Sequence, residues 1–96
     1  MSTTAEPSRV RFRSRRAARE FDALSQTDYR KIRAAIAQLA SDPRPSGSVQ
    51  IFGNIFRIRV GRHRIIYLVD DGERTVDIGG VRRRSESTYR GVRDLF

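Results

Sequence analysis

Residues 53–67 read GNIFRIRVGRHRIIY, and apolar and basic side chains alternate on both sides of Gly61. A period of two residues is typical of a strand with one buried and one solvent-facing side, and a central glycine is typical of a tight turn. The stretch therefore predicts a β-hairpin that is apolar on one side and offers its basic side to a polyanion. Its arginines are Arg57, Arg59, Arg62 and Arg64.

The charge of the whole chain supports a polyanionic partner. Its 96 residues include 20 basic and 11 acidic side chains, which gives a formal net charge of +9, and Lys31 is the only lysine. One guanidinium group can donate two parallel hydrogen bonds to two oxygens of a phosphate. A surplus of positive charge attracts nucleic acid or an acidic protein. A bias toward arginine codons would explain much of the arginine-to-lysine ratio but not the net charge.

Length and composition indicate one small folded domain. The hydrophobic content is 38%, as in folded proteins, and there is no cysteine for a disulfide or a thiolate metal site. The chain has no run of about 18 apolar residues that could span a membrane, and its first residues lack the apolar core of a signal peptide. We expect a disordered lead-in at residues 1–8, a single domain at residues 9–96 and a cytoplasmic location.

The elements before the hairpin can be predicted from short patterns. Residues 9–13 read RVRFR and predict a strand. Ser14 is a suitable N-cap for a helix over residues 15–24, and Thr27 is one for a helix that ends near Ser41. Because only a few residues separate them, we expect the two helices to form a helical hairpin.

The remaining patterns complete the expected fold. A short strand at residues 49–52 precedes the hairpin strands at 56–60 and 64–70, the second of which is apolar on both faces and should be central. A turn at Asp71 and Gly72 leads to a last strand at residues 75–81, and a short terminal helix follows. These elements predict an α+β fold with an antiparallel sheet of about four strands and both helices on one face.

A set of four arginines and one tyrosine is the candidate site. In an antiparallel sheet these side chains could converge on one surface, hold a phosphodiester and stabilise charge on a pentacoordinate phosphorus. The five residues are Arg57, Arg59, Arg64, Arg83 and Tyr89. Neighbouring candidates for RNA binding are Arg62, His63, Arg82 and Arg84.

Neither a metal nor a cofactor is expected at this site. Because it is the only histidine, His63 cannot form a metal site alone, and we interpret it as an exposed turn residue. A solvated turn with arginine partners explains the acidic side chains near the last hairpin better than a metal site does. These are Asp70, Asp71, Glu73 and Asp77.

Several motifs together resemble the RelE/ParE superfamily of toxins from bacterial type II toxin–antitoxin systems. They are the strand-helix-helix opening, DPRP at residues 42–45, GNIFRIRVGRHRIIY at 53–67, and a basic cluster with a tyrosine six residues after Arg83. The resemblance spans about residues 10–95. RelE-like members are endonucleases that cleave mRNA in the ribosomal A site through attack of the ribose 2′-hydroxyl on the adjacent phosphate, which would make this chain a translation inhibitor.

The resemblance also implies roles for single residues. Arg57 and Arg59 match the paired basic residues of the sheet, Arg64 and Arg83 match further basic positions, and Tyr89 matches the C-terminal tyrosine. Arginine keeps its proton near neutral pH, so these side chains are better suited to bind phosphate than to act as a base. The proton acceptor could be Tyr89, His63, a ribosomal group or water. The glycine pair 79–80 leaves Arg82 and Arg84 as alternatives to Arg83.

Other functions of the superfamily remain open at this point. The ParE-like branch inhibits DNA gyrase without nuclease activity, and a degenerate toxin would keep only its contact with an antitoxin. In each case we expect a cognate antitoxin with an acidic or amphipathic segment to bind the basic domain. A nuclease would also have the ribosome and mRNA as partners, and no membrane partner is expected.

Overall fold

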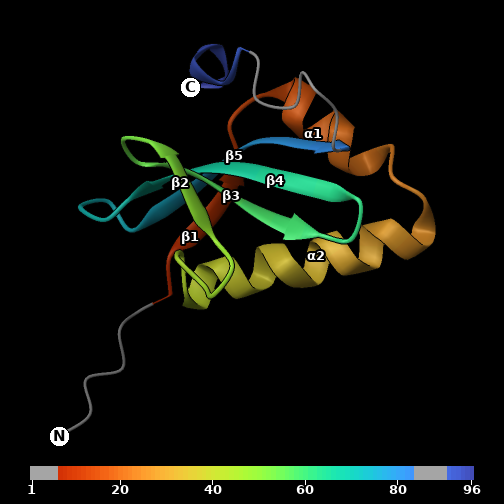
Figure 1. The fold of residues 1–96 in the computed structure, drawn as a ribbon, viewed down its shortest axis with the longest axis horizontal. Coiled ribbons are helices and arrows are strands. Elements are labelled where there is room, and N and C mark those ends of the chain that lie inside the picture. Colours follow the sequence, from red (N-terminus) through yellow and green to blue (C-terminus); the bar gives the residue numbers. More distant parts are fainter. Residues whose placement is uncertain (1–6, 84–90) are drawn as a thin grey trace, which may run out of the picture.

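The computed structural model describes residues 7–83 and 91–96 and contains a five-stranded sheet, with the longer helix across one face and the shorter helix beside one edge (Figure 1). In chain order the elements are β1 (Arg9–Phe12), α1 (Arg15–Asp22), α2 (Gln26–Ser41), β2 (Val49–Phe52), β3 (Ile55–Val60), β4 (His63–Asp70), β5 (Thr75–Arg83) and the 3-10 turn η1 (Val92–Leu95).

Serine side chains begin both helices. Ser14 Oγ accepts a hydrogen bond from the Ala17 amide at 3.1 Å, which confirms the predicted cap of α1. The cap of α2 is Ser25, whose Oγ accepts from the Asp28 amide at 3.3 Å, so the prediction of Thr27 was wrong by two residues. The aromatic rings of Phe21 and Tyr29 stack at 4.4 Å and join the two helices.

The sheet has the strand order β1-β5-β4-β3-β2 and is mixed. Strands β2, β3, β4 and β5 are consecutive in the chain, and each pairs with the next in antiparallel orientation. Strand β1 pairs with β5 in parallel. The prediction of a purely antiparallel sheet of about four strands was therefore wrong. No tight turn fixes the direction of β1, because this strand and its neighbour lie at opposite ends of the sequence.

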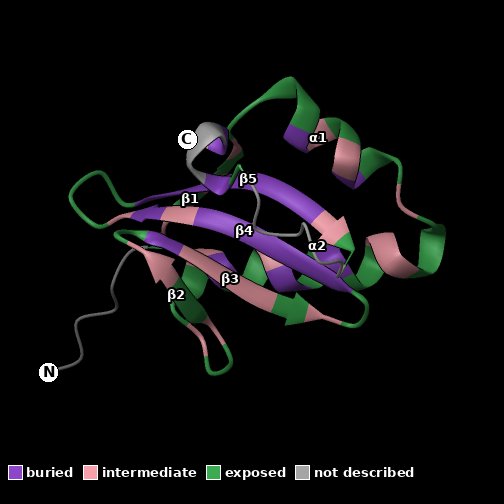
Figure 2. Ribbon diagram, turned by 45° about the horizontal axis from the view of Figure 1, so that its top comes forward, coloured by how far each residue is buried: buried purple, intermediate pink, exposed green. Residues whose placement is uncertain are grey.

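The two faces of the sheet differ in what covers them. On the helix side, Ile32 and Leu39 of α2 pack with Ile65, Ile78 and other buried residues of the sheet. The opposite face, which we call the open side, carries a smaller cluster around Ile66. β4 and β5 are buried over most of their length, as Figure 2 shows, which confirms that residues 64–70 form an inner strand.

The chain ends differ in part from the expectations. In the described residues, the segment of the predicted terminal helix contains the short 3-10 turn η1, and Val92, Leu95 and Phe96 pack in the cluster on the open side. The expected start of that helix and residues 1–6 of the lead-in lie outside the described residues. Ser8 already belongs to the fold, since its amide donates to the Ala40 carbonyl at 2.7 Å.

Tyr67 connects the centre of the sheet to the loop after α2 by a hydrogen bond. The same residue makes the free energy of unfolding decrease at alkaline pH. Its hydroxyl donates to the Pro43 carbonyl at 2.8 Å, and burial raises the pKa of this tyrosine from 10.0 to about 12. The unfolded chain therefore ionises first, so the stabilisation is complete below pH 10 and is lost as the pH rises toward 12.

We therefore expect Tyr67→Phe to lower the free energy of unfolding by about 0.5 to 1.5 kcal/mol at pH 8. The difference from the wild type should shrink in urea titrations as the pH rises from 10 toward 12. Tyr29→Phe is the control, because it keeps Tyr67 and should keep the alkaline loss of stability. A Tyr67→Phe curve parallel to the wild-type curve at all pH values would contradict the assignment.

Candidate functional site

Three arginines lie side by side on the open side, one on each of β3, β4 and β5. The Cα register pairs Arg59 with Arg64 and Arg64 with Arg82. Side chains directly opposite each other in an antiparallel pair share a face and have Cβ atoms roughly 5 Å apart. We call Arg59, Arg64 and Arg82 the arginine row. Arg57 lies two residues before Arg59 on β3 and therefore faces the same side.

Positive charge in the row is only partly balanced. Arg64, between the other two, has 4% of its surface exposed. Among the described residues, the single carboxylate at ion-pair distance from the row is that of Glu20, whose Oε2 lies 3.6 Å from Arg82 Nε. Like charges opposite one another on a sheet are destabilising, so the row contains repulsion that a bound phosphate would relieve.

A β-bulge decides which arginine of β5 joins the row. Ile66 pairs with Gly80 but Tyr67 pairs with Ile78, so Gly79 has no opposite residue. An extra residue of this kind reverses the sides of the later side chains relative to a regular strand. The last strand also continues to Arg83 rather than ending at Val81 as predicted.

The bulge determines which of the predicted arginines share a face of the sheet. Val81 packs in the helix-side core, Arg82 faces the open side, and Arg83 pairs with His63 on the helix side. The register therefore puts Arg82, rather than Arg83, beside Arg64. The adjacent glycines in the sequence were the signal for this shift, and Arg82 was one of the two alternatives that they left open.

The other predicted site residues are placed as follows. His63 is 6% exposed at the start of β4, so its interpretation as an exposed turn residue was wrong. It lies across the sheet from the arginine row, because it pairs with Val60 of the helix-side core. Arg62 is exposed in the turn after Gly61, whose φ of 60° suits glycine. Arg84 and Tyr89 lie outside the described residues.

The acidic residues near the last hairpin fall into two groups. Asp71 receives two hydrogen bonds from Arg44 at 3.0 and 2.9 Å, and this contact lowers the pKa of its carboxyl. Asp77 is 2% exposed and binds Arg11 Nε at 2.6 Å, so it is not a solvated turn residue as predicted. No group of three or more His, Cys, Asp or Glu side chains in the described part could hold a metal ion.

The segment at residues 91–96 covers the middle of the open side. Val92 and Leu95 pack with Ile66 in the open-side cluster. The Phe96 ring lies against Gly79, where an added Cβ would clash with carbons of the ring. This segment therefore covers the part of the open side next to the arginine row.

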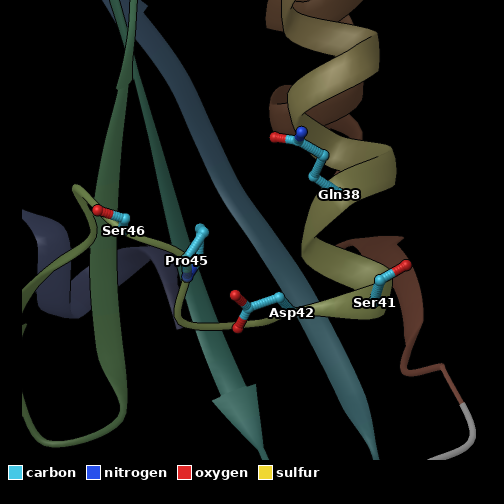
Figure 3. Close-up of a pocket in the computed structure, with 5 residues that line it drawn as sticks. All are labelled: Gln38, Ser41, Asp42, Pro45 and Ser46. Atoms are coloured by element: carbon cyan, nitrogen blue, oxygen red, sulfur yellow. The ribbon is translucent and has the colours of Figure 1, made fainter. Parts of the chain in front are cut away.

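An open depression of about 450 Å³ lies elsewhere, at the C-terminal end of α2 (Figure 3). Its lining residues are Gln38, Ser41, Asp42, Pro45 and Ser46. The carboxylate of Asp42 already accepts a hydrogen bond from the Arg44 amide at 3.2 Å and so shapes the loop. No arginine of the row is among the residues that line this depression. No helix among the described residues has the length and apolar character needed to cross a bilayer.

Comparison with known sequences identifies the family. Residues 12–88 match the family described as the ParE toxin of the type II toxin-antitoxin system, parDE. A search of the curated proteins gives no match.

Solved structures show the same fold. A mutant of Escherichia coli toxin RelE in the free state is 18% identical, with a TM-score of 0.77 over 94% of this chain and 99% of that chain. RelE in the RelE–RelB complex from Pyrococcus horikoshii is 21% identical, with a TM-score of 0.71 over 83% and 98% of the two chains.

A third match is more similar in sequence. It comes from the toxin–antitoxin complex RelBE2 of Mycobacterium tuberculosis and is 28% identical, with a TM-score of 0.59 over 81% of this chain and 99% of that chain. The family match covers most of the sequence. The RelE structures have the same arrangement of helices and sheet as this chain. This chain therefore belongs to the RelE/ParE superfamily of toxins from type II toxin–antitoxin systems.

Proposed function

We propose that this toxin is a ribosome-dependent mRNA endonuclease in which the arginine row and Arg57 hold the phosphate that is cleaved. The observation that carries the proposal is the strand register, which puts Arg59, Arg64 and Arg82 side by side on one face. Guanidinium groups at this spacing can bind several oxygens of one phosphodiester.

The reaction would be an internal displacement at phosphorus. The ribose 2′-oxygen forms a bond to the phosphorus while the bond to the 5′-oxygen of the next nucleotide breaks. The products are a 2′,3′-cyclic phosphate and, once the leaving 5′-oxygen has taken a proton from water, a 5′-hydroxyl. Negative charge grows on the non-bridging oxygens in the transition state, where fixed positive groups stabilise it most.

The proton of the 2′-hydroxyl needs an acceptor outside the arginine row, because a guanidinium keeps its own protons. His63 does not face the row, since its strand register puts it on the helix side. We keep Tyr89 as the proposed acceptor from the chain itself, with the ribosome or water as the other sources. Attack at phosphorus requires alignment, and we propose that the ribosome supplies it by holding the mRNA.

A reconstituted translation reaction tests this function. We expect the purified toxin to stop protein synthesis and to leave mRNA cut at positions defined by codons, as mapped by primer extension. The same mRNA without ribosomes should remain largely intact. Intact mRNA in a translation reaction that has stopped would reject the nuclease and favour another target.

Inhibition of DNA gyrase is the second candidate, because the matched family is described as the ParE toxin. In that case the basic surface would contact a protein or DNA without cleaving RNA. A supercoiling assay with purified gyrase separates the two functions. We expect supercoiling to continue at a large excess of this toxin, and inhibition at equimolar toxin would support the alternative.

We also propose that a cognate antitoxin neutralises the toxin. Similar proteins were crystallised as RelE–RelB and RelBE complexes. The net charge of +9 favours an acidic segment in the partner, because complementary charge speeds association.

A further inference from the structure

We infer that Glu20 of α1 is a positioning residue, which fixes the guanidinium of Arg82 in the arginine row. The contact is a property of the fold. Its effect on cleavage rests on the proposed nuclease function.

Strand β1 covers only the first part of the outer edge of β5. Strand β1 pairs with β5 only from Thr75 to Ile78, and the rest of β5 runs beside α1 (Figure 1). Backbone amides at such an edge need another acceptor when they are not open to water. Glu20 Oε1 accepts the hydrogen bond of the Val81 amide at 3.1 Å. The Glu20 carboxylate therefore accepts the hydrogen bond that a neighbouring strand would otherwise accept from this amide.

The second oxygen of the same carboxylate faces the site. Glu20 Oε2 lies 3.6 Å from Arg82 Nε, and the two side chains are 25% and 22% exposed. Val81 and Arg82 are consecutive residues, so one carboxylate contacts the backbone of the strand and the guanidinium that extends from it. Partly exposed ion pairs contribute little to stability, so we expect the main consequence to be the orientation of Arg82.

Gly80 provides the space for this arrangement. A Cβ at this position would lie 3.2 Å from Glu20 Oε1 and 3.3 Å from Arg82 Nε. Its φ lies outside the positive range, so an alanine there would be opposed by these contacts rather than by backbone strain. Gly80 pairs with Ile66, one row away from Arg64 and Arg82. The glycine thus lets the carboxylate approach the open side next to the row.

The test uses Glu20→Gln, which keeps the length of the side chain and an acceptor for the Val81 amide but removes the charge. Single-turnover cleavage of ribosome-bound mRNA should slow about 10-fold to 100-fold, by analogy with the loss of a group that orients a ligand in a metal site. The toxin concentration for half-maximal rate should change little. Asp22→Asn removes an exposed carboxylate from the same helix and should leave the rate unchanged.

A double mutant separates positioning from direct chemistry. If Glu20 acts only through Arg82, Glu20→Gln should cause no further loss when Arg82 is already alanine. Independent, multiplying losses would mean that Glu20 acts on the substrate itself, for example as the proton acceptor, and would overturn the inference. An unchanged rate in Glu20→Gln alone would overturn it as well.

An NMR measurement, which does not depend on mRNA cleavage, tests the contact between Glu20 and Arg82 independently of the proposed nuclease function. The Arg82 Nε–H signal, assigned by its absence in Arg82→Ala, should be shifted away from the position of exposed arginines in the NMR spectrum of the wild type, because the Glu20 carboxylate lies 3.6 Å from Nε. It should move to the position of exposed arginines in Glu20→Gln and stay in place in Asp22→Asn. If the wild type does not cleave mRNA, the nuclease proposal fails and this signal still decides whether Glu20 holds Arg82. An identical signal in Glu20→Gln would reject the contact.

Discussion

Replacing Arg82 by alanine should slow ribosome-dependent mRNA cleavage by about 100-fold to 1,000-fold, the usual loss when one fixed donor to a transition-state anion is removed. Arg82 is the β5 member of the arginine row and lies directly opposite Arg64. Arg83 has the same charge but pairs with His63 on the helix side. Arg83→Ala should therefore have a much smaller effect, even though the residues are adjacent.

The comparison needs a control for loss of charge alone. Arg33→Ala removes one exposed arginine from α2, on the far side of the sheet, and should keep nearly the full rate. The rates should be measured in single-turnover reactions, with thermal unfolding to confirm that each variant is folded. A larger loss in Arg83→Ala than in Arg82→Ala would contradict the placement of the site on the open side.

Replacing Leu39 by alanine should lower the free energy of unfolding by about 2 to 5 kcal/mol. Leu39 is 0% exposed and packs α2 onto the sheet within the helix-side core. A domain of this size has a stability of roughly 5 to 15 kcal/mol, so the loss is a large part of the total. The sheet depends on this layer, because the cluster on its open side is much smaller.

Urea unfolding of the two proteins measures this effect, and Lys31→Ala on the same helix is the matched control. Lys31 is exposed, so its replacement should change the free energy of unfolding by about 0.5 kcal/mol or less. Equal urea midpoints for Leu39→Ala and Lys31→Ala would mean that α2 does not hold the sheet as described.

Much of the fold could be predicted because its signals are local. The alternation around Gly61 defines β3 and β4, and the two apolar faces of residues 64–70 indicate an inner strand. Ser14 is a helix cap that acts within three residues of itself. Such patterns depend on neighbours in the chain, so a sequence is sufficient to recognise them.

The parts that could not be predicted depend on contacts between distant residues. The parallel pairing of β1 with β5 joins segments 66 residues apart. The bulge at Gly79 is a choice of register, and a shift of one residue exchanges Arg82 and Arg83 without changing the composition of the strand. His63 is buried at the start of β4, one residue before the predicted start of this strand.

Glu20 shows why a site residue can escape a sequence-based search. It belongs to α1, between Ala17 and Phe21 of the buried helix face, and nothing nearby in the sequence indicates a partner. Its two contacts are with Val81 and Arg82, about 60 residues further along the chain. The available signal was indirect, since Gly80 leaves space on the strand that a carboxylate occupies.

The chemical groups at the cut ends of the mRNA distinguish attack by the ribose 2′-hydroxyl from other routes of inhibition. We expect mRNA recovered from a reconstituted translation reaction with the wild-type toxin to carry a 2′,3′-cyclic phosphate on the upstream fragment and a 5′-hydroxyl on the downstream fragment. Mass spectrometry of the fragments identifies both groups, and the Arg82→Ala reaction should contain far less of each. Full-length mRNA throughout an inhibited reaction, or fragments with a 5′-phosphate, would contradict the account.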